Sequence, residues 1–191
     1  PFGTPLSSNE FDLEEKSKTK RLRILFVGSM TQRKGLADLF DAIELVDASK
    51  VELVVLGSLA APLSFYTDQV KFTYEPTRSH DKVLELMRTC DVFCLPSIVE
   101  GRALVIQEAM SQGLPIIITP NTGAEDLVID EETGFLVPIR NPDAIADKIN
   151  WFLANRNKIF QMGKKAKQLA DTYSWDSYAN KICTVLSSSE N

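Results

Sequence analysis

The stretch from Val92 to Thr119, "VFCLPSIVEGRALVIQEAMSQGLPIIIT", decides the fold. It begins and ends with short apolar runs, and between them lie a polar loop and a helical pattern that ends at Gly113, before Pro115. Glycine commonly caps the end of a helix, and proline cannot continue one. The apolar runs do not alternate with polar residues, which is typical of parallel strands covered on both faces. The stretch therefore predicts a strand–helix–strand unit.

The same alternation continues along the chain. Amphipathic patterns typical of helices separate the apolar runs, one of them opening with Asn141 as N-cap and Pro142 at the first helical position. Two further helices are expected to lie between there and Leu186, with a break near residues 172–176. The expected strands are Leu22–Val27, Val51–Leu56, Val70–Tyr74, Val92–Leu95, Ile116–Thr119 and Phe135–Val137.

This order predicts an α/β fold with a doubly wound, Rossmann-like parallel sheet, helices on both faces and terminal helices packing back. Residues 1–21 are polar and turn-rich, so we expect an entry or linker segment there. Residues 22–187 would form the domain and 188–191 a disordered tail. The chain starts at Pro1 without an initiator methionine, which suggests a piece of a longer protein.

Composition narrows the classes of function. The net charge of −5 argues against a broad basic face for nucleic acid, and no apolar run approaches the roughly 18 residues that span a bilayer. Three cysteines and a single histidine give neither a disulfide framework nor zinc-ligand spacing, so we expect no metal site. A reducing, cytoplasmic location is the default expectation.

Ligands of doubly wound sheets bind outside the carboxyl ends of the strands, so the loops that follow the strands carry the candidate site. In the first, "VGSMTQRKGL", Gly28 ends the strand, Arg33 and Lys34 are adjacent, and Gly35 opens a helix. This is neither a Walker A loop nor a G-x-G-x-x-G fingerprint. Two cations beside a helix N-terminus suit a phosphate or diphosphate. A solvated basic turn is the alternative.

A second candidate loop contains Glu100, and Glu108 follows on the next helix. If both were helical they would lie about 12 Å apart along the axis, too far for an acid/base dyad. We expect Glu100 in the loop and Glu108 in the second turn, as acceptors for the hydroxyls of a diol. Alternatively, Glu100 caps the helix and Glu108 faces solvent. The unpaired N–H donors expected between them, which suit an anion, belong to Gly101, Arg102, Ala103 and Leu104.

Three other features are more typical of structure than of function. His80, at a helix start, is interpreted as a surface or capping residue. Residues 121–123 form a turn, and a short helix begins at Glu125. Trp175 and Tyr178 share one helical face, for which core packing is the expectation.

Together the motifs resemble the C-terminal half of a GT-B glycosyltransferase of glycosyltransferase family 4. The resemblance rests on "ILFVGSMTQRKGLADLFDAI", "EGRALVIQEAMSQGLPIIIT" and "TGAEDLVIDEETGFLVP", and above all on the two glutamates separated by seven residues. It implies a domain that binds a nucleotide-sugar donor in an interdomain cleft. It also implies that the sugar is transferred with retention and without a metal held by an Asp-x-Asp motif.

The resemblance also implies roles for residues. Lys34 would hold the donor diphosphate, helped by Arg33 or Thr31. Glu108 would accept the ribose hydroxyls, and Glu100 would contact the transferred sugar or its phosphate end. The remaining donor-binding residues would be Gly28, Ser29, Gly101, Arg102, Ala103 and Leu104, and the catalytic ones Lys34, Arg33 and Glu100.

The chain departs from the family in one of these positions. Many members have arginine directly after the strand-ending glycine, where this chain has Ser29. Arg33 is the nearby replacement. The pocket for the base is not assigned, because Thr73 and Tyr74 stand where members often carry a glycine.

The donor implied is a UDP- or GDP-sugar, with no cofactor. The acceptor, a sugar, lipid or polysaccharide, would bind an N-terminal domain absent from this chain, and any membrane association would involve the full-length protein. The chain alone would bind a nucleotide weakly and transfer little sugar. The alternative is a non-catalytic regulatory or assembly module of the same fold; a dehydrogenase would need the missing glycine fingerprint.

Overall fold

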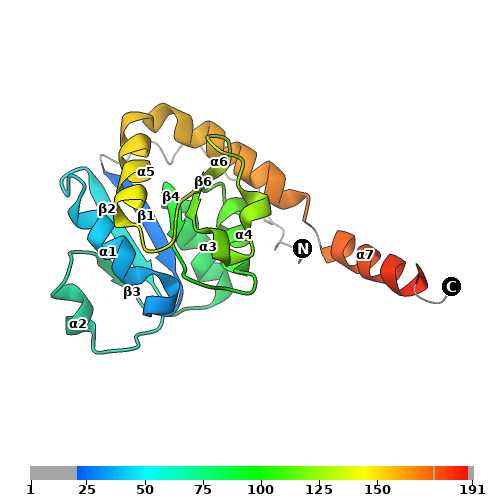
Figure 1. The fold of residues 1–191 in the computed structure, drawn as a ribbon, viewed down its shortest axis with the longest axis horizontal. Coiled ribbons are helices and arrows are strands. Elements are labelled where there is room, and N and C mark those ends of the chain that lie inside the picture. The colour runs from blue at the N-terminus through cyan, green and yellow to red at the C-terminus, as the bar shows by residue number, and fades with distance from the viewer. Residues whose placement is uncertain (1–20, 174, 189–191) are drawn as a thin grey trace.

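A computed structural model describes residues 21–173 and 175–188, which form a six-stranded parallel sheet in the order β3-β2-β1-β4-β5-β6 (Figure 1). The expected α/β class is confirmed, because every neighbouring pair of strands is parallel. The expected segments 1–21 and 188–191 lie, apart from Arg21 and Ser188, outside the described residues. The strands are β1 (Leu22–Val27), β2 (Val51–Leu56), β3 (Thr73–Glu75), β4 (Val92–Leu95), β5 (Ile116–Ile118) and β6 (Gly134–Leu136).

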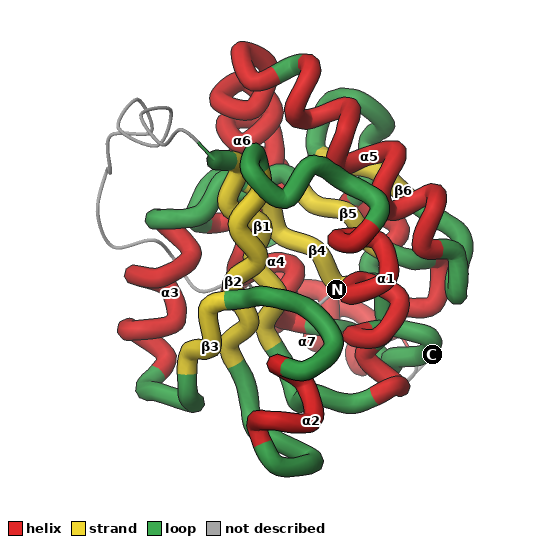
Figure 2. The backbone as a smooth tube through the Cα atoms, turned by 90° about the vertical axis from the view of Figure 1, so that its left-hand side faces the viewer, coloured by secondary structure: helices red, strands yellow, loops and turns green. Residues whose placement is uncertain are grey.

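Helices cover both faces of the sheet (Figure 2). The helices α1 (Leu36–Glu44) and α5 (Pro142–Ala154) pack together on one face, and α3 (His80–Arg88) packs with α4 (Leu104–Ser111) on the other. Every residue of the strands β4 and β5 is therefore buried, which explains their unbroken apolar sequence. None of the helices in the described ranges is long and apolar enough to cross a membrane.

The expected caps and turns are largely confirmed. The side chain of Asn141 accepts a hydrogen bond from the N–H of Ala144 at the start of α5. Gly113 follows the end of α4 with a φ of 77°, a left-handed conformation that glycine adopts without strain. The turn after β5 consists of two short 3₁₀ helices, Pro120–Thr122 and Glu125–Leu127.

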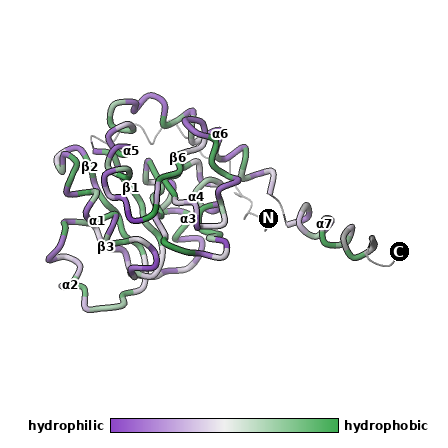
Figure 3. The backbone as a smooth tube through the Cα atoms, in the orientation of Figure 1, coloured by the Kyte–Doolittle hydropathy of each residue, from purple (hydrophilic) through white to green (hydrophobic). Residues whose placement is uncertain are grey.

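The two terminal helices behave differently. α6 (Arg156–Asp171) packs back on α4 and α5, as expected. α7 (Trp175–Ser188) extends away from the sheet (Figure 1), and hydrophobic and hydrophilic residues follow one another along it (Figure 3). Trp175 is 52% exposed, so the expected core packing of this residue is wrong; its ring contacts that of Tyr178 edge-on. The pattern predicts an apolar face but not what covers it.

The start of β3 also differs from the expectation. The apolar run at Val70–Tyr74 predicts a strand from Val70, whereas β3 begins at Thr73. The reason is the register: β3 pairs only with the carboxyl half of β2, from Val54 to Leu56. Phe72 instead stacks on Phe40 of α1, with ring centroids 5.3 Å apart.

The strand order places a topological switch between β1 and β4. The chain leaves β1 toward α1 on one face and leaves β4 toward α4 on the other, so the loops after these neighbouring strands diverge. In doubly wound sheets ligands bind in the crevice that such a divergence creates. The two candidate loops of the sequence analysis are these two loops.

Candidate functional site

The loop after β1 brings Lys34 over the end of that strand. Residues Gln32–Lys34 form a 3₁₀ helix, and the stem of Lys34 crosses Gly28, where an added Cβ would stand 3.4 Å from Lys34 Cε. Gly35 follows with a φ of 70° and is the N-cap of α1. A Cβ on Gly35 would lie 1.9 Å from the carbonyl oxygen of Pro96. Only glycine therefore lets the loops after β1 and β4 touch.

A cluster of three charges joins these loops. Nη1 of Arg33 and Nζ of Lys34 lie 2.7 Å and 2.8 Å from the same carboxylate oxygen, Oε1 of Glu100. The N–H of Ile98 also donates to the carbonyl of Arg33. The Lys34 and Glu100 side chains are only 13% and 11% exposed, so this pair is largely removed from water. This ion-pair cluster brings together the two loops that carry the candidate residues.

The cluster keeps Glu100 ionised. Burial by itself would raise the pKa of the Glu100 carboxyl, but the hydrogen bonds from Lys34 and Arg33 and their charges together outweigh it. The pKa of Glu100 is therefore lower than that of an exposed glutamate. Since Lys34 and Arg33 have further N–H donors, both can bind an additional anion while Glu100 accepts hydroxyl groups.

Helix α4 begins at Leu104, with Ala103 as N-cap. The N–H of Ala103 donates to the carbonyl of Thr122, so one of the four donors expected for an anion is already used. Within the described residues, the N–H groups of Gly101, Arg102 and Leu104 have no backbone acceptor. A Cβ on Gly101 would meet no atom within 4 Å. The start of α4 is thus open to a ligand.

The guanidinium group of Arg102 has a structural role. Its Nη1 donates to the carbonyl of Gly123 and to Asp126, at 2.6 Å and 3.0 Å. Asp126 also accepts from the hydroxyl of Tyr173, whose pKa is raised by burial and by the Asp126 charge. The guanidinium group of Arg102 therefore braces the loop after β4 against the turn after β5, and Arg102 offers the site its backbone N–H.

Glu108 lies in the second turn of α4, as expected, and its carboxylate contacts a side chain of another helix. Its Oε1 lies 3.3 Å from Nε2 of His80, the first residue of α3. His80 is half exposed, which fits the expected surface position, whereas its contact with Glu108 is a site feature that the sequence analysis missed. One signal was available, because a residue that starts a helix after a strand lies at the carboxyl edge of the sheet.

The remaining site residues are held by a segment that was not predicted. The short helix α2 (Leu63–Thr67) places the Tyr66 hydroxyl 2.8 Å from the carbonyl of Met30. The N–H of Thr31 donates to the carbonyl of Ser29, which closes the turn. Ser29 and Thr31 thereby lie in the same loop as Lys34, at the switch point.

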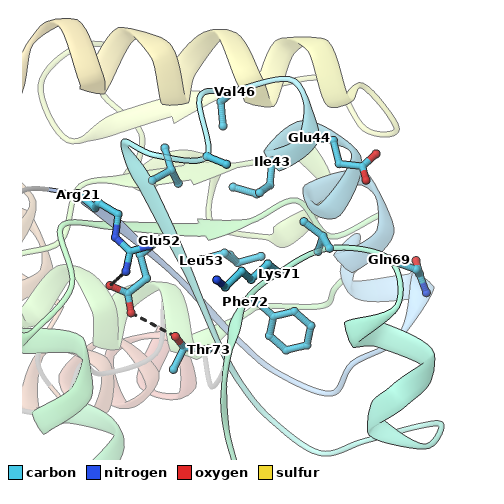
Figure 4. A pocket seen from close by; sticks show the side chains of 13 residues that line it. Arg21, Ile43, Glu44, Val46, Glu52, Leu53, Gln69, Lys71, Phe72 and Thr73 are labelled. Atoms are coloured by element: carbon cyan, nitrogen blue, oxygen red, sulfur yellow. Dashed lines mark hydrogen bonds and ion pairs between the residues drawn. The ribbon is translucent and has the colours of Figure 1, made fainter.

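A cavity of about 380 Å³ lies at the opposite end of the sheet (Figure 4). It is bounded by the end of α1, the amino end of β2 and the segment before β3, including Phe72 and Lys71. Ion pairing of Arg21 with Glu52, and a hydrogen bond from Thr73 to Glu52, form one wall. No predicted site residue lines this cavity.

A family model described as "Glycosyl transferases group 1" matches residues 8–169. The chain belongs to this family. It is 29% identical over 155 residues to an uncharacterized glycosyltransferase of Methanocaldococcus jannaschii, a match that covers 80% of this chain and 44% of the relative. The chain spans half or less of the length of the curated relatives it matches.

Solved structures of glycosyltransferases share the fold. Sucrose-phosphate synthase from Thermosynechococcus elongatus superposes with a TM-score of 0.77 at 24% identity, over 97% of this chain and 49% of that one. HepE of Anabaena, solved in complex with UDP, superposes with a TM-score of 0.77 at 21% identity, over 94% of this chain and 56% of that one. The fold of the chain is thus Rossmann-like and matches that of the C-terminal domains of GT-B glycosyltransferases.

Proposed function

We propose that the chain binds the nucleoside diphosphate of a sugar donor, as the donor domain of a retaining family 4 hexosyltransferase. The observation that carries the proposal is the cluster in which Arg33 and Lys34 meet Glu100 beside the open start of α4. A diphosphate needs cations and N–H donors that converge from more than one side, and this point of the sheet supplies both.

The role of Glu100 follows from its two cations. When the phosphates of a donor draw Lys34 and Arg33 toward them, the ionised carboxylate is left to accept hydroxyl groups of the transferred sugar. The leaving diphosphate would then be stabilised by the two cations and by the dipole of α4, without a metal. Glu108 would accept the ribose hydroxyls.

The ligands bound to one structural neighbour support the proposed class of donor. HepE of Anabaena has been solved with UDP and with UDP-glucose. We extend this to a uridine or guanosine diphosphate sugar here, since the phosphate-binding groups described above do not distinguish the two bases. The transferred group would be a hexosyl unit.

The acceptor would bind elsewhere. Because the chain spans half or less of its relatives, we assign the acceptor, whether sugar, lipid or polysaccharide, to an N-terminal domain of a longer, cytoplasmic protein. Any membrane contact would involve that longer protein. The chain alone is expected to bind the nucleotide weakly and to transfer little or no sugar; robust transfer by this chain would refute the assignment.

A non-catalytic regulatory or assembly module of the same fold is the second candidate. It is favoured by the exposed apolar residues of α7, among them Trp175 and Leu186, which suit a protein partner. It predicts no nucleotide binding at the switch point.

Calorimetric titration of the chain with UDP, GDP and ADP separates the two. The donor domain predicts that UDP or GDP binds, with and without EDTA, and that Lys34→Ala and Glu108→Ala weaken binding. Lys71→Ala, which removes a cation from the opposite end of the sheet, is the matched control. Absence of binding by all three nucleotides, with an inert full-length protein, would favour the assembly module.

A further inference from the structure

The pair formed by His80 and Glu108 joins two helices at the edge of the site. Nε2 of His80 lies 3.3 Å from Oε1 of Glu108. His80 is the first residue of α3, and Glu108 lies in the second turn of α4. Both helices start at the carboxyl end of the sheet, because α3 follows β3 and α4 follows β4. The pair therefore lies on the side of the sheet where the donor is proposed to bind.

The chemistry of the pair fixes the position of the shared proton. An ionised carboxylate only accepts hydrogen bonds, so Nε2 of His80 carries the hydrogen whether the imidazole is neutral or charged. This contact uses Oε1 of Glu108 and leaves Oε2 available for other donors. Glu108 is the one ionisable side chain of α4, and within the described residues His80 is the side chain that meets its carboxylate.

The two glutamates of the site differ in how they are held. Two cations fix the Glu100 carboxylate, whereas the Glu108 carboxylate, at the end of three rotatable bonds, contacts a single imidazole from another helix. A contact from a second helix restricts the rotamers of Glu108 before any ligand arrives, and such preorganisation lowers the entropic cost of binding.

We propose that His80 is a positioning residue of the donor site: its Nε2–H holds Oε1 of Glu108 so that Oε2 is presented to the ribose hydroxyls of the nucleotide. The inference rests on the proposed function, in which Glu108 is the ribose acceptor. A purely structural role at the start of α3 would change the stability of the fold but not the recognition of ribose.

The test compares a nucleotide with its 2′,3′-dideoxy analogue, using whichever of UDP and GDP the wild type binds. Dissociation constants are measured for the wild type, His80→Ala, His80→Gln and Glu108→Gln. We expect His80→Ala to weaken binding of the nucleotide about fivefold, the size of one hydrogen bond of ordinary net strength, and to leave binding of the analogue unaffected. His80→Gln, whose amide N–H can still donate, should restore most of the difference.

Two further measurements separate positioning from a general effect. Adding His80→Ala to Glu108→Gln should cause no additional loss, since His80 acts through Glu108. Because His80 is the chain's single histidine, its imidazole proton resonance can be followed by NMR without assignment. The nucleotide should shift this resonance in the wild type and much less in Glu108→Gln.

The inference is overturned if His80→Ala binds the nucleotide like the wild type while Glu108→Gln is weakened. It is equally overturned if His80→Ala weakens binding of the nucleotide and binding of the dideoxy analogue to the same extent. Failure of the wild type to bind either UDP or GDP would instead refute the proposed function, and the role of His80 with it.

Discussion

The two ends of the sheet differ in what they offer a ligand. The amino end has a hollow of about 380 Å³ beside the first half of β2, the part of that strand with which β3 does not pair. At the carboxyl end, Lys34 and Arg33 each lie within hydrogen-bonding distance of Glu100, beside N–H groups that have no backbone acceptor among the described residues. Convergent donors and acceptors therefore indicate the carboxyl end as the site of a charged ligand.

Removing one lysine from each end of the sheet tests this difference most strongly. Lys34→Ala should weaken nucleoside diphosphate binding about 30- to 100-fold, because it removes a largely buried cation that donates charged hydrogen bonds. Lys71→Ala should leave the dissociation constant unchanged. Calorimetry on both variants checks this, and equal losses would show that the two ends do not differ as described.

A substitution at the amino end should instead lower the stability of the fold and leave nucleotide binding unchanged. Phe72→Ala removes a ring that stacks on Phe40 at the amino end, so we expect a loss of about 2 kcal/mol in the free energy of unfolding. The dissociation constant of the nucleotide should change by less than about twofold from that of the wild type. Urea denaturation and calorimetry on the same sample measure the two quantities. A large loss of affinity would link the cavity to the site.

Acid should remove the stabilisation that the ionised Glu100 carboxylate contributes at the carboxyl end. The pKa of Glu100 is lowered in the folded state, so Glu100 contributes stability above its unfolded pKa that is lost as the pH falls through its folded pKa. Between pH 7 and pH 3 the wild type should therefore lose more stability than Glu100→Gln, which does not titrate at this position. Thermal denaturation across this range is the measurement, and parallel curves would contradict the pairing.

The smallest effect is expected for Arg33. Its side chain is 52% exposed, so solvent and salt screen its charge more than that of Lys34. Arg33→Ala should weaken binding of the nucleotide only about threefold, and the difference in affinity from the wild type should shrink at high salt. A loss as large as that of Lys34→Ala would give Arg33 the principal role in phosphate binding.

Sequence reasoning predicted the central part of the molecule well, for local reasons. The bounds of β1, β2 and β4 are confirmed, because buried parallel strands have continuous apolar sequences. The sequence also placed Lys34 and Glu100 in loops that follow strands, where ligands of doubly wound sheets bind, but it did not predict their ion pair.

The errors arise where register or long-range contacts decide. The late start of β3 depends on its pairing with β2, and the used N–H of Ala103 depends on a carbonyl from the loop after β5. The contact between His80 and Glu108 joins residues 28 positions apart on two helices. None of these contacts leaves a periodic pattern in the sequence, so local patterns could not predict them.

The most direct test of the central claim is to map the backbone N–H resonances of the ¹⁵N-labelled chain during titration with UDP or GDP. The claim predicts shifts centred on Gly28, Gly101 and Leu104, with no change at Val51 or Phe72, and their disappearance in Lys34→Ala. Shifts centred on residues 69–73 would place the nucleotide in the amino-end cavity and contradict the account, as would the absence of any shift with either nucleotide.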